Sequence, residues 1–155
     1  MKKNKLLIPF AMLISALIFS GCSGKKSSAA IEDVYARMQS EVKFPTPMLK
    51  MDDDYFVMQF GFNLEDFDQY IYVQGEDILL AESVILIKAK SGVDTNKIKH
   101  KLESFVSDQA TVFNSYIPEQ GKVAEKSVVV AKGSYVYLLM SSKVSELKKI
   151  AQEMI

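Results

Sequence analysis

Residues 83–90 read SVILIKAK, an apolar run dense in Val, Ile and Leu that Ser91-Gly92 ends. A run that is apolar on both faces predicts a strand in a central position of a sheet. The preceding segment, residues 68–74, alternates in side-chain character and ends at Gly75, which predicts a neighbouring strand. The centre of the chain therefore predicts a pair of strands joined by a short connection.

A second pair of apolar runs, residues 126–132 and 135–140, lies nearer the C-terminus. The two runs are joined by Gly133-Ser134, and Gly at the first central position suits a type II′ hairpin turn. Strand pairs separated by a helix predict an antiparallel sheet of about four strands, with helices packed on at least one face. The predicted fold class is α+β.

Helical patterns surround these strands in the order helix, short helix, β, β, long helix, β, β, helix. The first helix begins at Ile31 and ends before Pro45, and Asp52 or Asp53 caps the short helix that Gly61 closes. Asp94 caps the long helix, and a last helix begins near Val144. The inward stripe predicted for the long helix consists of Ile98, Leu102, Phe105, Val106, Gln109, Val112, Phe113 and Tyr116.

The composition limits the classes of function. The chain has 155 residues, enough for one domain, with 19 Lys and Arg against 19 Asp and Glu. A net charge of zero argues against nucleic-acid binding, which needs a basic excess. One cysteine cannot form an intramolecular disulfide, and one histidine cannot build the common zinc sites.

The N-terminus has the pattern of an export signal. Lys2, Lys3 and Lys5 precede an apolar run over residues 6–19, which is shorter than the ~20 residues that a membrane-spanning helix needs. The following residues 19–22, Phe-Ser-Gly-Cys, resemble a bacterial lipobox, with Phe19 in place of the usual Leu. The resemblance implies that Cys22 is acylated and becomes the new N-terminus. An uncleaved anchor and an ordinary secretory signal are the alternatives.

This interpretation predicts three parts: a lipoprotein signal peptide over residues 1–21, the acylated Cys22 with a tether over residues 22–30, and a single α+β domain over residues 31–155. Two acyl chains on Cys22 would supply the apolar length that stable membrane anchoring requires. We therefore expect the protein on the extracytoplasmic face of the cell membrane.

Three short motifs follow the lipobox in order: residues 81–83 (AES), residues 116–120 (YIPEQ) and residues 132–136 (KGSYV). Together they resemble a family of lipoproteins from Gram-positive bacteria known as domain of unknown function 4358, over residues 31–154. The resemblance supports the localisation and the domain boundaries. It implies no activity, substrate or catalytic residue.

Nothing in the sequence predicts a catalytic, metal or cofactor site. His100 lies between two lysines on the polar side of the long helix, where we expect it to be exposed. The run Asp52-Asp53-Asp54 lacks the Gly and Glu of a calcium-binding loop, so helix capping is the simpler interpretation. We therefore expect a protein that is not an enzyme.

Four tyrosines are the candidate partner-binding residues. Tyr70 and Tyr72 share one face of a strand, as do Tyr135 and Tyr137, because alternate residues point the same way. If both pairs lie on an uncovered face of the sheet, four phenols would form a surface for a protein or glycan. The alternative is that one pair packs in the core.

These patterns favour a membrane-anchored extracytoplasmic module for binding or interaction at the cell surface. Two other functions stay open. One is an envelope hydrolase that uses carboxylates such as Glu65 and Asp68. The other is a small solute-capturing lipoprotein, although the predicted domain leaves little room for two lobes around a ligand.

Overall fold

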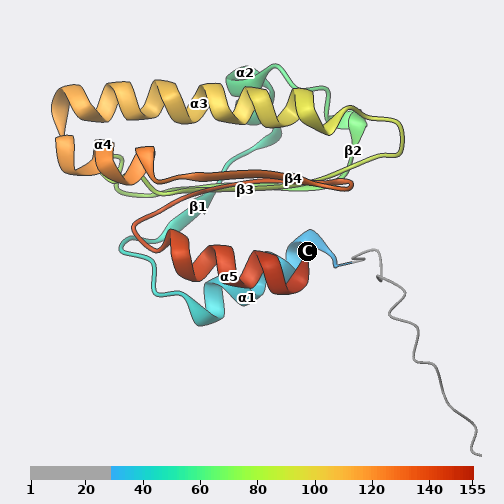
Figure 1. Cartoon of the computed structure of the whole chain (residues 1–155), viewed down its shortest axis with the longest axis horizontal. Coiled ribbons are helices and arrows are strands. Elements are labelled where there is room, and N and C mark those ends of the chain that lie inside the picture. Colours follow the sequence, from blue (N-terminus) through green and yellow to red (C-terminus); the bar gives the residue numbers. More distant parts are fainter. Residues whose placement is uncertain (1–28) are drawn as a thin grey trace, which may run out of the picture.

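The computed structural model describes residues 29–155, in which a five-stranded sheet lies between two layers of helices (Figure 1). The α+β class is confirmed. The helices are α1 (Ile31–Glu41), α2 (Asp53–Phe60), α3 (Thr95–Tyr116), α4 (Pro118–Glu125) and α5 (Val144–Met154), with a 3₁₀ turn, η1 (Leu64–Asp66). The strands are β1 (Met48–Lys50), β2 (Phe67–Gly75), β3 (Ser83–Ala89), β4 (Val128–Lys132) and β5 (Tyr135–Met140). Every pairing is antiparallel, in the order β1-β2-β3-β5-β4.

Strand β3 occupies the centre of the sheet, as its sequence predicts. Val84 pairs with Val73 of β2 on one side and with Leu139 of β5 on the other. All of β3 is buried except Lys88, which is half-buried. The first residue, Ser83, pairs with Gln74 and Met140, so β3 begins where β2 and β5 end.

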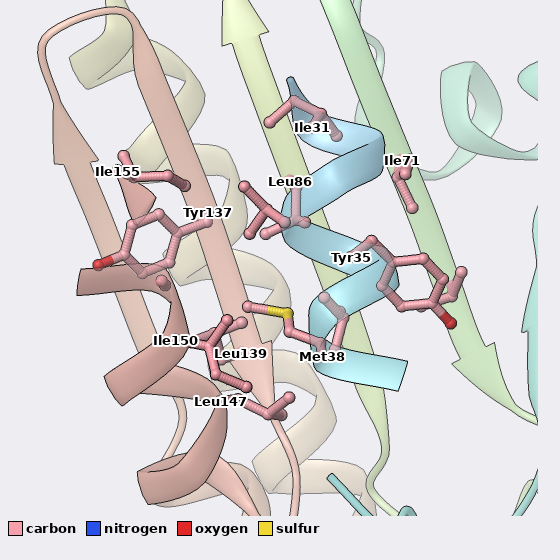
Figure 2. Packing of buried hydrophobic residues seen from close by; sticks show 14 of the residues in the cluster. Ile31, Tyr35, Met38, Ile71, Leu86, Tyr137, Leu139, Leu147, Ile150 and Ile155 are labelled. Atoms are coloured by element: carbon pink, nitrogen blue, oxygen red, sulfur yellow. The ribbon is translucent and has the colours of Figure 1, made fainter. Parts of the chain in front are cut away.

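Helices cover both faces of the sheet. Helices α1 and α5 pack on one face, where Met38, Leu139 and Leu147 lie together in the buried cluster (Figure 2). Helices α2 and α3 pack on the other face, against a second buried cluster that contains Phe56 and Leu102. The sequence predicts helices on at least one face, and the structure has them on two.

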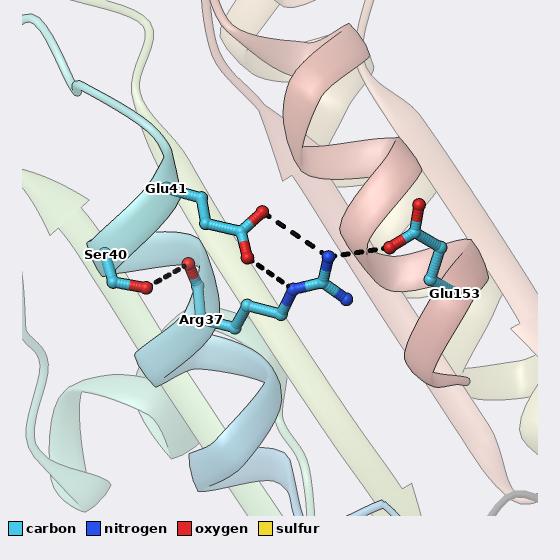
Figure 3. A network of polar contacts seen from close by, with 4 residues as sticks. All are labelled: Arg37, Ser40, Glu41 and Glu153. Carbon is cyan, nitrogen blue, oxygen red and sulfur yellow. Dashed lines mark hydrogen bonds and ion pairs between the residues drawn. The ribbon is translucent and has the colours of Figure 1, made fainter.

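An arginine joins α1 to α5 at the surface. The Arg37 guanidinium donates one hydrogen bond to Glu41, one turn along α1, and another to Glu153 of α5. Both have a length of 2.7 Å (Figure 3). These side chains are exposed enough for water and salt to weaken the attraction, so the pairs add little stability. They connect the exposed sides of the two helices.

The predicted helix ends are confirmed by their caps. The Asp52 carboxylate accepts the Tyr55 N–H at 2.7 Å, and Gly61 closes α2 with φ of 59°. Asp94 accepts the Asn96 N–H at 3.0 Å at the start of α3. Gly133 has φ of 61° in the β4–β5 hairpin, a backbone angle that favours glycine.

Besides the 3₁₀ turn η1, the structure adds a strand and a helix to the elements that the sequence predicts. The three residues of β1 form the fifth strand at the edge beside β2. Helix α4 begins at Pro118, where α3 ends, and folds back along α3. The contact is so close that a Cβ at Gly121 would lie 2.0 Å from Asn114 Oδ1, so a larger residue there would have to displace the Asn114 side chain.

Candidate functional site

The prediction that the four tyrosines form an exposed surface is wrong. Tyr72 is 1% exposed, Tyr135 and Tyr137 are also buried, and Tyr70 is half-buried. The two pairs lie on opposite faces of the sheet, Tyr70 and Tyr72 toward α2 and α3, and the other two toward α1 and α5. Because helices cover both faces, the four phenols form no common surface.

These tyrosines have structural contacts instead. The Tyr72 ring lies 5.4 Å from the Phe56 ring and 5.6 Å from the Phe60 ring, and its hydroxyl accepts the Gln74 amide N–H. Burial raises the pKa of Tyr72 above that of an ordinary tyrosine. The Tyr135 hydroxyl donates to the Ala29 carbonyl at 2.8 Å, which ties the start of the described chain to the hairpin end of the sheet.

The other residues singled out in the sequence fall in three places. Cys22 and the predicted signal peptide lie outside the described residues. His100 is exposed as predicted, with Nδ1 3.1 Å from Glu103 Oε2. Asp52 caps α2, and no group of three metal-ligating side chains occurs within residues 29–155.

Glu65 and Asp68 are both exposed on the surface. The pocket beside them has a volume of about 500 Å³ and is lined by other charged side chains, including Asp66 and Lys101. Lys101 Nζ donates to the carbonyl oxygens of Phe60 and Gly61 at 2.9 and 2.8 Å. The two carboxylates proposed for hydrolysis therefore do not line this pocket.

A different set of residues meets at the end of the sheet where β2 ends and β3 begins. We call this region the β2–β3 corner: the connection at residues 76–82, the last turns of α3 and the first turn of α4. The Ala81 N–H donates to Gln120 Oε1 of α4 at 2.9 Å. The Ser142 N–H, in the turn before α5, donates to Glu82 Oε1, also at 2.9 Å. Two of the three sequence motifs thus meet in space.

Glu82 is a buried residue that connects the β2–β3 corner to its neighbours. Its side chain is 3% exposed, and Oε2 has no hydrogen-bond partner within residues 29–155. Its backbone carbonyl accepts the Gly75 N–H at 2.8 Å, which extends the β2–β3 pairing by one residue. The carboxylate therefore joins the β2–β3 connection to the turn between β5 and α5.

Replacing Glu82 with alanine is expected to lower the free energy of unfolding by about 2 kcal/mol. The Ser142 N–H would lose its acceptor, and a void would replace the carboxylate. Urea unfolding followed by circular dichroism measures the change. Glu76, an exposed carboxylate in the same connection, is the matched control. An equal effect of Glu82→Ala and Glu76→Ala would contradict the role assigned to Glu82.

A pocket of about 200 Å³ opens at the β2–β3 corner, between the connection and α3. Its lining combines polar side chains with apolar ones. The lining includes Tyr55, Gln74, Ile78, Leu80, Gln109 and Phe113. A pocket of this size and mixed character fits one side chain of a partner or a small polar molecule.

Large apolar side chains are exposed around the pocket. Ile78 is 85% exposed and Tyr116 is 82% exposed, and Leu79 and Val112 are also exposed. Val112 and Tyr116 lie on the same side of α3 as Gln109, which lines the pocket, because residues three, four and seven apart share a helix face. The pocket therefore has an apolar rim on both of its sides.

The length of α3 explains why its stripe reaches the surface. The helix has 22 residues and is about 33 Å long, whereas β5, one of the two strands that it packs against, has six residues and extends about 20 Å. The helix therefore extends beyond the sheet, and its last inward-pointing residues have no strand beneath them. The prediction that Val112 and Tyr116 point into the core is wrong for this reason.

Sequence reasoning did not identify the β2–β3 corner. The available signal was the run Ile78-Leu79-Leu80, three apolar residues directly after the turn residues Gly75, Glu76 and Asp77. Apolar residues in a connection, outside any periodic element, have no core position to fill.

The comparison with protein families assigns the domain to a family. A family model described as domain of unknown function (DUF4358) matches residues 40–141. The chain belongs to this family. The DUF4358 match begins in the last turn of α1 and ends at Ser141, so it contains all five strands and all three sequence motifs. It is narrower than the resemblance over residues 31–154, because α5 and most of α1 lie outside it.

No curated protein and no solved structure matches the chain. Of the helices within residues 29–155, none is both long enough and apolar enough to cross a membrane. The DUF4358 assignment therefore gives the family of the domain, and its chemistry has to be inferred from the β2–β3 corner.

Proposed function

We propose that the protein is a lipoprotein of a Gram-positive bacterium, held on the extracytoplasmic face of the membrane by acylated Cys22. Its DUF4358 domain acts as a non-catalytic binding module. The charged n-region, the apolar run and the lipobox-like residues 19–22 support the anchor. The β2–β3 corner is the surface that meets the partner.

The observation that carries this proposal is the separation of the two ends of the domain. Ala29, which follows the predicted tether, is bonded to Tyr135 at the hairpin end of the sheet. The β2–β3 corner lies at the other end, about 23 Å away along β3. In Figure 1 the hairpin and the start of α1 lie at the right, and the end of α3 lies at the left. An anchor at residue 22 would leave the corner facing away from the membrane.

The chemistry of the corner indicates the kind of partner. Exposed apolar side chains around a pocket favour protein contacts, and tyrosine is enriched among the residues that dominate binding energy. Two exposed carboxylates, Glu76 and Asp77, directly precede the apolar run that begins at Ile78. We infer a partner protein of the cell envelope that inserts an apolar side chain and carries basic residues beside it.

Photo-crosslinking in cells tests this proposal. A photoreactive residue replaces Ile78 or Tyr116 in the full-length protein, and Gln152, exposed on α5, is the control position. We expect one dominant crosslinked protein from positions 78 and 116 and none from position 152. Ile78→Asp should weaken binding of that protein by about tenfold or more. The same products from all three positions, or none above background, would contradict the proposal.

The pocket favours solute capture as a second candidate function. Its polar lining from Gln74 and Gln109 would suit a small hydrogen-bonding molecule. A thermal-shift screen of polar metabolites with purified domain separates the two functions. A ligand whose stabilisation is lost in Gln109→Leu would favour solute capture, whereas a crosslinked protein without any such ligand would favour the interaction module.

A further inference from the structure

We propose that the free edge of β4 is a second interaction surface, which binds an extended segment of another protein as a sixth strand. Within residues 29–155, strand β4 is last in the sheet order and pairs with β5 alone. The edge of a sheet carries backbone N–H and C=O groups that can bind a further strand. This surface is distinct from the β2–β3 corner and does not depend on it.

The direction of the backbone groups in β5 determines which residues of β4 face outward. The Ala89 N–H donates to the Ser134 carbonyl at 2.8 Å, so Ser134 faces β3. Backbone groups alternate in direction along an antiparallel strand, so the next residue, Tyr135, faces β4. Its partner in the register is Lys132. Alternate residues of β4, counted back from Lys132, therefore bond to β5.

The residues between them, Val129 and Ala131, direct their N–H and C=O groups away from the sheet. Within residues 29–155, β4 has no strand on this side, and no backbone hydrogen bond from a turn, loop or cap reaches these groups. Together they offer two donors and two acceptors, which is the pattern that an antiparallel strand satisfies. An added strand would pair with Val129 and Ala131 directly.

The side chains of β4 suit such pairing. Val128, Val129, Val130 and Ala131 are all half-buried, so an added strand would remove apolar surface from water on both faces of the sheet. The opposite edge differs. Strand β1 has three residues, and Pro45 and Pro47, which lack N–H groups, precede it. Of the two outermost strands within residues 29–155, β1 and β4, only β4 offers five residues without a neighbouring proline.

Two lysines favour one kind of occupant: Lys132, the last residue of β4, and Lys126, the C-cap of α4 two residues before β4 begins. Lys126 and Lys132 lie on either side of the apolar residues, and both are exposed. Neither forms an ion pair within residues 29–155. A complementary strand has β-branched residues in its middle and carboxylates six residues apart at its ends.

A second copy of the chain fits this edge less well. Antiparallel pairing of two β4 strands about Val130 would bring lysines of the two copies toward each other. It would also place the two Ala29 residues at opposite ends of the joint sheet. If both copies are anchored as proposed above, at least one tether would have to extend along the joint sheet to reach the same membrane. We therefore assign the edge to a different protein.

Two synthetic heptapeptides test the charge pattern on the full-length protein, purified in detergent. The first is acetyl-Glu-Thr-Val-Thr-Val-Thr-Glu-amide, and the second has Lys in place of both Glu residues. Nuclear magnetic resonance titration at low salt reports binding through the amide signals of Val129 and Ala131. We expect the acidic peptide to bind at least about fivefold more tightly, with slowed hydrogen exchange at both amides.

Two variants of the protein make the test specific. The double substitution Lys126→Glu and Lys132→Glu should reverse the preference between the peptides. Val129→Pro removes an outward N–H that the fold does not use, so it should abolish binding without changing the circular dichroism spectrum. Should Val129→Pro unfold the domain, the peptide methylated on its backbone nitrogens replaces it, and loss of binding is again expected.

Three results would overturn the proposal. The first is that neither peptide perturbs Val129 and Ala131. The second is that the acidic peptide binds the Val129→Pro protein, or the methylated peptide binds the unchanged protein, as tightly as the acidic peptide binds the unchanged protein. The third is a concentration-dependent dimer of the domain that Val129→Pro abolishes, because the edge would then belong to a second copy.

Discussion

Replacing Tyr72 with alanine is expected to lower the free energy of unfolding by about 3–5 kcal/mol, enough to unfold many domains of this size. The ring is 1% exposed and packs against Phe56 and Phe60, so its removal leaves a void between the sheet and α2. Urea unfolding, followed by circular dichroism in the far ultraviolet, measures the loss of stability. The effect would show that this tyrosine belongs to the core.

Two matched variants serve as controls for Tyr72→Ala. Tyr72→Phe keeps the ring and removes only the acceptor of the Gln74 N–H, so its cost should be about 1 kcal/mol. Tyr116→Ala removes an exposed side chain and should change stability by less than about 0.5 kcal/mol. A small effect of Tyr72→Ala, close to that of Tyr116→Ala, would contradict the packing described here.

The same phenol makes stability depend on alkaline pH. Burial, and to a smaller degree the neighbouring Tyr55, raises the pKa of Tyr72 in the folded state above its unfolded value near 10. Below about pH 10 both states hold the proton, and its contribution to stability is complete. Above it the unfolded state releases the proton first, so stability falls as pH rises. The fall should be smaller in Tyr72→Phe.

Replacing Cys22 with alanine is expected to abolish lipid attachment. The sequence offers no other cysteine as an acyl acceptor. Incorporation of an alkyne-tagged fatty acid, detected on the purified full-length protein, should fall to background. The protein should also keep residues 1–21, which the mass of the intact protein reports.

Ser23→Ala, next to the proposed attachment site, is the control and should be labelled and processed as the natural sequence is. Because Cys22 lies before the described residues, the melting temperature of the domain should be unchanged in Cys22→Ala. Equal labelling, with unchanged processing, would refute the lipoprotein proposal and leave an ordinary secretory signal or an uncleaved anchor.

The Cys22 experiment decides which end of the domain faces the membrane. If Cys22 carries the lipid, the bond between Tyr135 and Ala29 places the hairpin end toward the membrane. The β2–β3 corner, with Ile78 and Tyr116, then faces outward. Failure of the Cys22 prediction would remove that orientation without touching the peptide test of β4.

Local patterns were sufficient to predict most of the elements. The run at residues 83–90 predicted the central strand because apolar side chains on both faces need cover on both sides. Asp52 and Gly61 predicted the ends of α2 because capping depends on neighbouring backbone groups alone. Strand β1 and helix α4 were missed. Three residues carry no periodicity, and Pro118 both ends one helix and begins the next.

The sequence by itself determined which side chains share a face: Tyr70 with Tyr72, and Val112 with Tyr116 in line with the buried stripe of α3. Only the tertiary structure decided which of those faces is covered. Alternation along a strand is a local property, whereas cover depends on where distant helices pack. Tyr72 is buried because α2 lies over it, and Tyr116 is exposed because α3 is longer than the strand beneath it.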